Sequence, residues 1–334
     1  MTSFIFIVTP ETFKLCIKKG VCGCPRISSA QPEARGLADI SGIRHGSKIL
    51  FFIKGTKEIY GIYKAKTFPF FDDTQIWDDP EHIFPYRVLI EPTLDTFEKP
   101  IFLSDLYDLA DKGLLWSWRR IVKRSVQPFT DAETSLLLKL FYRNNRFGPT
   151  SSHIETPYNP TDRKPLPIKL KSNSRGRIIT PGAPEGHLTA WLMNQLANRK
   201  LKEFFGDYND YINFVPTSYG KEMDVLLLNE IKNSLTGKPI VGSLASCTIV
   251  EVKAGKCKKS DLIQTLKYED WLIKKKCAGD SAMVHSAILA HSFDDEVSEY
   301  VKKRSEMEGK EVILLKYSAD AGNISLTSIM QMRN

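Results

Sequence analysis

Residues 247–255 read Cys-Thr-Ile-Val-Glu-Val-Lys-Ala-Gly, an apolar run that ends in an acid and a lysine two positions apart. The run predicts a β-strand, and because strand side chains alternate between two faces, Glu251 and Lys253 point the same way. Charged groups in an apolar strand are costly unless they are paired or take part in chemistry. A carboxylate that holds a metal beside a cation that holds a phosphate or a water is what phosphodiester hydrolysis needs.

A second acid interrupts an apolar run upstream, in Met223-Asp224-Val225-Leu226-Leu227-Leu228. A lone aspartate in a strand often marks an edge or a turn position. Asp224, however, precedes Glu251 by 27 residues, which is one hairpin length. Adjacent strands would bring Asp224, Glu251 and Lys253 to one face of a sheet, and the three together are far more specific than any one of them.

These residues, together with Gln264-x-x-x-Tyr268 on a predicted helix, resemble the PD-(D/E)xK nuclease superfamily. The likeness is closest to its NucS/RecB-like branch, in which a VELKxG strand is followed by a QxxxY helix. The resemblance implies that Asp224 and Glu251 bind Mg²⁺, for which Mn²⁺ is expected to substitute. It also implies that Lys253 orients the attacking water and that Gln264 positions Lys253 or contacts the backbone phosphate.

Many members of this superfamily carry a further acid on the first helix of the fold. Glu185, in Pro184-Glu185-Gly186-His187, stands where that acid is expected, and it is the candidate for a third metal ligand. An acid at a helix N-terminus is also favoured by the helix dipole alone, so both explanations stay open. Mg²⁺ keeps several waters, so two carboxylates are enough protein ligation.

The composition is that of an ordinary globular protein, with 334 residues of which 42% are hydrophobic and 26% charged. This length suffices for two domains. We find no apolar run of about 18 residues and no signal peptide at the start, so the expectation is a cytoplasmic protein without a membrane partner. Six cysteines in such a chain predict reduced thiols, and the single Cys22-Gly23-Cys24 makes structural zinc the less favoured alternative.

The net charge of +8 and the sequence pI of about 9.0 favour a polyanionic partner. Basic residues form two runs, each beside a suspected site, and any one run is equally well explained as a solvated face. The residues expected to contact the DNA backbone are Arg119, Arg120, Lys123, Arg124 and Lys256.

Residues 1–143 predict a first domain that is rich in strands. The expected strands are Phe4–Val8, Lys48–Ile53, Ile59–Lys66 and Tyr86–Ile90, and the expected helices are Glu11–Lys19, Leu103–Lys112 and Asp131–Phe141. Prolines and polar residues at 144–184 predict a linker or loosely packed arm, with a hairpin around residues 173–176.

Residues 185–320 predict a second domain of the α/β class, with a mixed central sheet flanked by helices. The expected helices are 188–205, 260–275 and 294–308, and the expected strands are 223–228, 247–253 and 311–316.

The first domain resembles the PUA-like superfamily, in particular EVE domains and their YTH relatives. The matching stretches follow one another in the family's order: Phe4–Val8, Gly20–Gly23, Gly46–Phe52, Tyr60–Tyr63, Ile76–Trp77, Phe84–Val88 and Arg124–Thr130. The resemblance implies an α+β fold around a small β-barrel, with an aromatic pocket that accepts a flipped, modified base. Stacking on aromatic rings and hydrogen bonds to the base edge explain such a pocket.

The base-binding candidates that the resemblance carries over are Trp77, Cys22, Gly23, Phe70, Trp116 and Trp118. Trp77 is the strongest, because it lies in a loop with four aspartates, where burial for size alone is not expected. The family often has a tryptophan at the position of Cys22, so one wall of the pocket is smaller here or comes from elsewhere in the chain.

Taken together, the two resemblances imply a modification-dependent, type IV-like restriction endonuclease. The first domain would flip and bind a modified base in double-stranded DNA, and the second, in a homodimer, would cut the duplex. Two alternatives remain open. One is a repair or RNA-processing nuclease that does not depend on modification, and the other is a catalytically silent nucleic-acid-binding protein.

Overall fold

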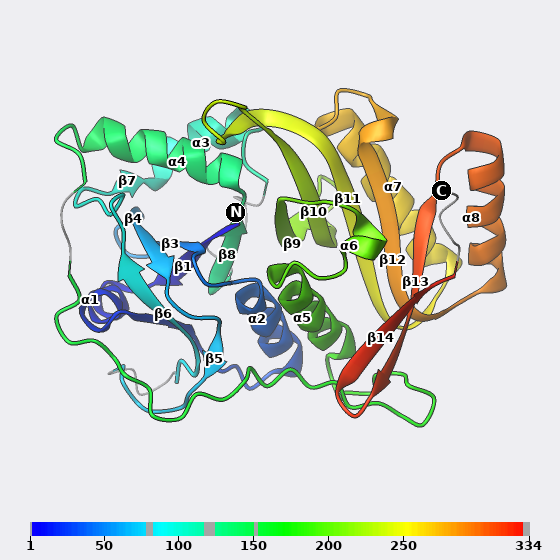
Figure 1. Cartoon of the computed structure of the whole chain (residues 1–334), viewed down its shortest axis with the longest axis horizontal. Helices are drawn as coiled ribbons and strands as arrows, with labels where there is room; N and C mark the ends of the chain where they lie inside the picture. The colour runs from blue at the N-terminus through cyan, green and yellow to red at the C-terminus, as the bar shows by residue number, and fades with distance from the viewer. Residues whose placement is uncertain (1, 78–82, 117–123, 150–152, 330–334) are drawn as a thin grey trace. The chain divides into compact units, whose positions relative to one another are not determined.

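The computed structural model describes residues 2–77, 83–116, 124–149 and 153–329 (Figure 1). The chain divides into two compact units, each with its own sheet. One unit is Met1–Pro167 with Lys232–Val241, and the other is Ile168–Ile231 with Gly242–Asn334. The boundary between residues 167 and 168 falls inside the segment predicted to be a linker. Within the described residues, no helix has the length and apolar character needed to cross a membrane.

The first unit is built on a mixed sheet of eight strands in the order β2-β6-β4-β3-β1-β8, with β5 beside β6 and β7 beside β4. Strands β1 and β3 are parallel, and β8 is antiparallel to β1. The strands are β1 (Ser3–Val8), β2 (Val21–Cys24), β3 (Lys48–Ile53), β4 (Glu58–Ala65), β5 (Phe70–Phe71), β6 (Tyr86–Pro92), β7 (Ile101–Phe102) and β8 (Val126–Phe129).

The helices of this unit begin and end at strong local signals. Helices α1 (Pro10–Lys19), α3 (Leu103–Asp111) and α4 (Asp131–Asn144) were predicted, whereas α2 (Ala30–Ser41) was not. The Thr9 hydroxyl accepts a hydrogen bond from the backbone of Thr12, and α1 ends at Gly20, whose φ of 64° is left-handed. Thr130 and Glu133 form a capping box at the start of α4.

The first half of the predicted linker is hydrogen-bonded to the first unit. The backbone N–H of Tyr158 donates to the carbonyl of Lys19 over 2.8 Å. Phe71 and Lys164 exchange backbone hydrogen bonds of 2.7 and 3.0 Å. The chain therefore follows the edge of the first unit up to Pro167 before it enters the second.

The second unit contains a six-stranded sheet in the order β14-β13-β12-β11-β10-β9. The central strands β11, β12 and β13 are parallel, and the sheet has antiparallel pairs at both sides. The strands are β9 (Asp210–Pro216), β10 (Glu222–Lys232), β11 (Pro239–Cys257), β12 (Val284–Phe293), β13 (Val312–Asp320) and β14 (Asn323–Ser328).

Helices cover both faces of the central strands (Figure 1). Helix α5 (Pro184–Ala197) packs on one face, where Leu192 meets Val250 and Val252 in one core. Helices α7 (Lys259–Lys275) and α8 (Asp295–Glu308) pack on the other, over the core that contains Ile288 and Leu314. Strands buried on both faces are typical of parallel sheets. In register, Glu251 lies beside Ile288, so the acid belongs to the face that α7 and α8 cover.

The single helix predicted over residues 188–205 is two helices, α5 and the short α6 (Lys202–Phe205). Between them, Arg199 and Leu201 have φ angles of 57° and 69°. An α-helix cannot continue through this left-handed region. A 3₁₀ turn at Ser281–Met283 precedes β12.

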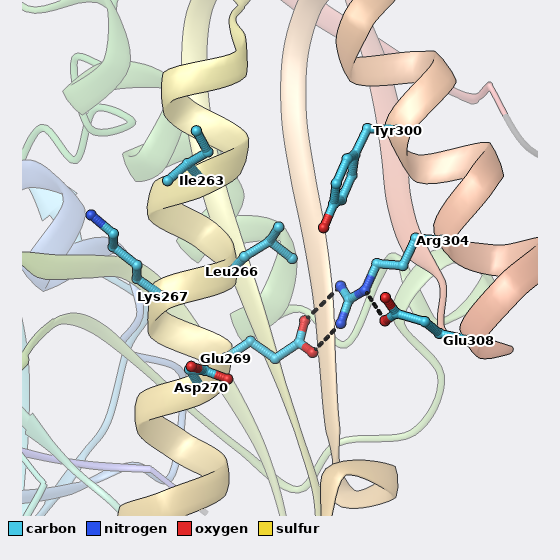
Figure 2. Close-up of a pocket in the computed structure, with 8 residues that line it drawn as sticks. All are labelled: Ile263, Leu266, Lys267, Glu269, Asp270, Tyr300, Arg304 and Glu308. Carbon is cyan, nitrogen blue, oxygen red and sulfur yellow. Dashed lines mark hydrogen bonds and ion pairs between the residues drawn. The ribbon is translucent and has the colours of Figure 1, made fainter.

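A buried ion cluster joins α7, α8 and β12. Figure 2 shows the Glu269 carboxylate directed toward Arg304, at a pocket of about 300 Å³. Glu269 accepts hydrogen bonds from Arg304 Nη2 (2.6 Å) and Ser286 Oγ (2.8 Å), and it also pairs with Lys310. Burial alone would raise the pKa of Glu269, but the hydrogen bonds from Arg304, Lys310 and Ser286 hold it below its usual value.

We predict that Glu269→Gln lowers the free energy of unfolding at pH 7 by about 3 kcal/mol, because Lys310 loses its paired carboxylate and Arg304 keeps only the exposed Glu308. The folded-state pKa of Glu269 is depressed, so its ionised form stabilises the fold at neutral pH. That contribution is lost as the pH falls through and below the usual glutamate range, so the gap to the wild type narrows in acid. Urea denaturation at several pH values measures both effects.

Glu308→Gln is the matched control. The Glu308 side chain is 59% exposed and bonds Arg304 Nε over 3.1 Å. Its loss is expected to cost less than about 1 kcal/mol. Equal losses in the two variants would contradict the assignment of Glu269 as the centre of the cluster.

Candidate functional site

Four of the predicted catalytic side chains converge where β10, β11 and α7 meet. Lys253 Nζ donates to Glu251 Oε1 over 2.8 Å, and Gln264 Nε2 donates to the same oxygen over 3.1 Å. Asp224 Oδ2 accepts a hydrogen bond of 2.8 Å from the backbone N–H of Val252. The acid of β10 is thus tied to the residue that lies between the acid and the lysine of β11.

Tyr268 holds the Gln264 side chain in place. Gln264 Nε2 donates to the Tyr268 hydroxyl over 2.8 Å, and that hydroxyl donates to the carbonyl of Glu222 over 2.9 Å. Gln264 and Tyr268 are four residues apart on α7, so they lie on one face of the helix. The spacing seen in the sequence therefore fixes the amide against β11 and ties α7 to β10.

The site combines two carboxyl groups and a lysine with little access to water. Glu251 is 1% exposed, and its burial raises its pKa. The positive charge of Lys253 lowers that pKa, but by less than burial raises it. The pKa of Asp224 is raised by burial and then by the negative charge of Glu251. Burial alone would lower the pKa of Lys253, but the charges of Glu251 and Asp224 raise it, so the lysine stays protonated.

The residues present fit a divalent cation. Glu251 Oε2 is buried and makes no hydrogen bond with any described residue. An unpartnered carboxylate oxygen beside a second carboxyl group that repels it is the environment that a cation relieves. Oxygen ligands are those that Mg²⁺ prefers. Glu251 Oε2 and Asp224 are the atoms that would hold it.

Glu185 lies in the first turn of α5 with an exposed side chain. Its charge contributes to the raised pKa of both Asp224 and Glu251, so it is within electrostatic reach of them. Among the residues the structure describes, however, no three histidine, cysteine or acidic side chains form a group that could hold a metal. The structure brings the carboxyl groups of Asp224 and Glu251 together, and a metal-binding role for Glu185 stays a prediction.

Two of the residues predicted to contact the DNA backbone, Arg124 and Lys256, lie in the described part of the structure, and both pair with an acid. The prediction for Arg124 is wrong, because its guanidinium is buried and pairs with Asp39. Its Nε donates to the Asp39 carboxylate over 3.0 Å, so it does not face solvent. Lys256 is half exposed and pairs with Asp294. Arg119, Arg120, Lys123 and the base-binding candidate Trp118 lie outside the described residues.

Three of the base-binding candidates lie next to residues 84–88 of the first unit. The Trp77 ring is 3% exposed and packs on Phe84, with ring centroids 5.2 Å apart. The Cys16 thiol faces this indole, and burial raises the pKa of Cys16 to about 12. Cys22 is fully buried and its Sγ lies 3.7 Å from the carbonyl oxygen of Val88. A Cβ on Gly23 would lie 3.2 Å from the carbonyl oxygen of Phe84, so the glycine allows this close approach.

The two remaining described candidates lie in different surroundings. Phe70 is buried on β5, and the guanidinium of Arg163 lies 5.3 Å from its ring centroid. Trp116 is half-buried, and its backbone N–H donates to Glu133 Oε1 at the start of α4.

A buried arginine that the sequence analysis missed organises the region around Trp77. Arg87 is completely buried on β6, pairs with Asp72 over 3.2 Å and donates to the Tyr158 hydroxyl over 2.9 Å. Its guanidinium carbon lies 5.0 Å from the centroid of Trp77. The signal was present in the sequence, because Arg87 interrupts an apolar strand in the same way that Asp224 does.

No family model matches the chain, and no curated protein matches it in sequence. Among solved structures, an EndoMS–double-stranded DNA complex is 18% identical over 37% of this chain, with a TM-score of 0.26. A repair endonuclease from Pyrococcus abyssi is 19% identical over 36%, with a TM-score of 0.25. This chain spans less than half the length of either, 43% and 46% respectively.

Human THYN1 in complex with DNA that contains 5-methylcytosine is also similar. It is 18% identical over 42% of this chain and 97% of its own length, with a TM-score of 0.30.

We predict that Arg87→Met lowers the free energy of unfolding by about 3–5 kcal/mol, because Asp72 keeps a buried charge without its cation. Chemical denaturation followed by tryptophan fluorescence measures the loss. Arg163→Met is the control: Arg163 is exposed, and losing its contact with the Phe70 ring should cost about 0.5–1 kcal/mol. A small effect at Arg87 would show that the ion pair does not hold this region.

Proposed function

We propose that this chain is a Mg²⁺-dependent DNA endonuclease whose cutting depends on a modified base. The observation that carries the proposal is that the two oxygens of the Glu251 carboxylate have different surroundings. Glu251 Oε1 is occupied by Lys253 and Gln264, while Oε2 is buried and unpartnered. A structural ion pair would satisfy both oxygens. An oxygen left open beside Asp224 and a protonated lysine supports a centre built for phosphodiester hydrolysis.

A divalent cation bound by Asp224 and Glu251 would supply a bound water of lowered pKa and neutralise charge on the scissile phosphate. The chain's own residues set the geometry. Glu251 holds the Lys253 ammonium at a fixed position, where its remaining N–H groups can donate to a phosphate oxygen or to the attacking water. Gln264, held by Tyr268, stops Glu251 from turning away.

Recognition of the modified base is assigned to the first unit. The support is the cluster of Trp77, Cys16 and Cys22, in which the indole Nε1 is buried without a hydrogen bond of normal geometry to any described residue. A donor of this kind can bind an acceptor on the edge of a flipped base, and the neighbouring rings can stack on it. One active centre cuts one strand, so a double-strand break requires a second copy, and we propose a homodimer on the DNA.

We predict that Lys253→Ala reduces cleavage by at least about 10²–10³-fold, the effect typical of removing one donor that stabilises a transition state. Binding of the duplex should be retained, because the backbone and the rest of the surface are unchanged. Lys274→Ala is the control, since Lys274 also belongs to the second unit but is 69% exposed and pairs with Asp270 on the same helix. A Lys253 variant that still cuts would rule out this active site.

The dependence on modification is tested with matched phage DNAs that are unmodified or carry 5-methylcytosine, hydroxymethylcytosine or N6-methyladenine. With Mg²⁺ present, we expect one modified DNA to be cut and the unmodified DNA to remain intact. Cutting of all four DNAs alike would favour a repair-type nuclease. Binding without any cutting would favour a silent nucleic-acid-binding protein.

A further inference from the structure

A tight turn at residues 172–178 presents an arginine next to the catalytic strand. Asn173 Oδ1 accepts hydrogen bonds of 3.0 Å from the backbone N–H groups of both Arg175 and Arg177. The backbone N–H of Asn173 donates to the carbonyl of Arg177, also over 3.0 Å. Ser172 and Ile178 pair as a β-bridge. The turn therefore closes on itself and has little freedom of its own.

The turn is also fastened to two strands of the sheet. The carbonyl of Gly176 accepts from the backbone N–H of Ala319 on β13 over 2.9 Å. The backbone N–H of Ile178 donates to the Tyr317 hydroxyl over 3.2 Å, and that hydroxyl donates to the carbonyl of Ala254 on β11 over 2.5 Å. A single buried hydroxyl thus links the turn to the residue that follows Lys253.

The guanidinium of Arg177 lies against the bare backbone of Gly255. Arg177 Nη2 is 3.2 Å, and its Cζ 3.6 Å, from the position that a Cβ would take on Gly255. Gly255 lies two residues beyond Lys253, roughly 6–7 Å along an extended strand. The register of β11 against β12 shifts between Lys253 and Lys256, which marks a bulge at this point. Bulges often lie beside active sites, where they redirect the chain.

The charge of Arg177 has no counter-charge among the described residues. No described carboxylate pairs with it, and its side chain is exposed. Burial lowers the pKa of His291 on β12, and the positive charges of Lys316 and Arg177 lower it further, so both cations lie within electrostatic reach of this strand. An exposed guanidinium on a fastened turn, without a paired anion, is suited to a phosphate, which it can bind with two parallel N–H groups.

We propose that Arg177 binds a backbone phosphate of the DNA next to the phosphate that is cut. The inference rests on the proposed nuclease function and deepens it, because it adds a substrate-binding residue that the metal centre does not include. A phosphate contact carries no sequence information. Arg177 therefore sets the position of the strand at the active site and leaves the choice of base to another part of the chain.

The test compares full-length Arg177→Ala with full-length Arg175→Ala, a control that alters the same turn. Binding of a fluorescein-labelled duplex is measured with Ca²⁺ in place of Mg²⁺, at salt concentrations from about 50 to 200 mM. We expect Arg177→Ala to weaken binding about tenfold or more and to reduce the slope of log K against log salt by about 0.9. The control should keep the wild-type slope. Arg177→Lys should restore the slope but not the full affinity, because an ammonium is a point charge.

Gly255→Ala is a second variant that keeps the arginine and places a Cβ against its guanidinium, which must shift by a few tenths of an ångström. The test therefore does not depend on how well Arg177→Ala folds. It should weaken binding in the same direction. If the wild type cuts DNA while both variants bind with the wild-type affinity and slope, the role of Arg177 is overturned and the proposed function stands. If the wild type neither binds nor cuts DNA, the proposed function itself fails, and the inference falls with it.

Discussion

The burial of the Glu251 carboxylate is the constraint on which the second unit depends. A charged group at 1% exposure costs several kcal/mol unless partners replace the lost water. Lys253 supplies the charge, and Gln264 supplies the hydrogen bond, which requires α7 to follow β11 with its amide facing back toward the strand. Tyr268 then has to reach β10 to keep that amide in place. The contacts among β10, β11 and α7 thus satisfy one of the two oxygens of this acid.

The elements that could be predicted from the sequence are those with a complete local signal. Helix α4 has its cap, its capping-box glutamate and its apolar stripe within 14 residues, and strand β3 was predicted with its observed bounds. Strand β12 was missed because it is buried on both faces, and its residues show no alternation. The N-terminal half of β11 contains Gly242, Ser243 and Ala245, which are residue types with low strand propensity. This half is a strand only because it pairs with neighbouring strands.

The same distinction divides the functional residues. Asp224, Glu251, Lys253 and Gln264 could be grouped in advance because one hairpin and one helix connect them. The role of Arg124 could not, since its partner Asp39 lies 85 positions away and only the folded chain shows that they meet. The role of Arg177 could not be predicted either: a hairpin around residues 173–176 was expected, but its attachment to the sheet depends on Tyr317, 139 positions after Ile178. Charges are easy to find in a sequence, but their counter-charges depend on tertiary structure.

The contacts of the Tyr317 hydroxyl also limit how short a fragment of the second unit can be. It belongs to β13, yet it bonds the carbonyl of Ala254, 63 positions earlier, and the backbone of Ile178. A fragment that starts at α5 and stops after α8 would keep every predicted catalytic side chain and lose this fastening. The smallest piece that preserves the carboxyl end of β11 therefore begins before the turn at 172–178 and continues through β13. Any recombination that exchanges this unit between proteins must carry both segments together, although more than a hundred residues separate them in the chain.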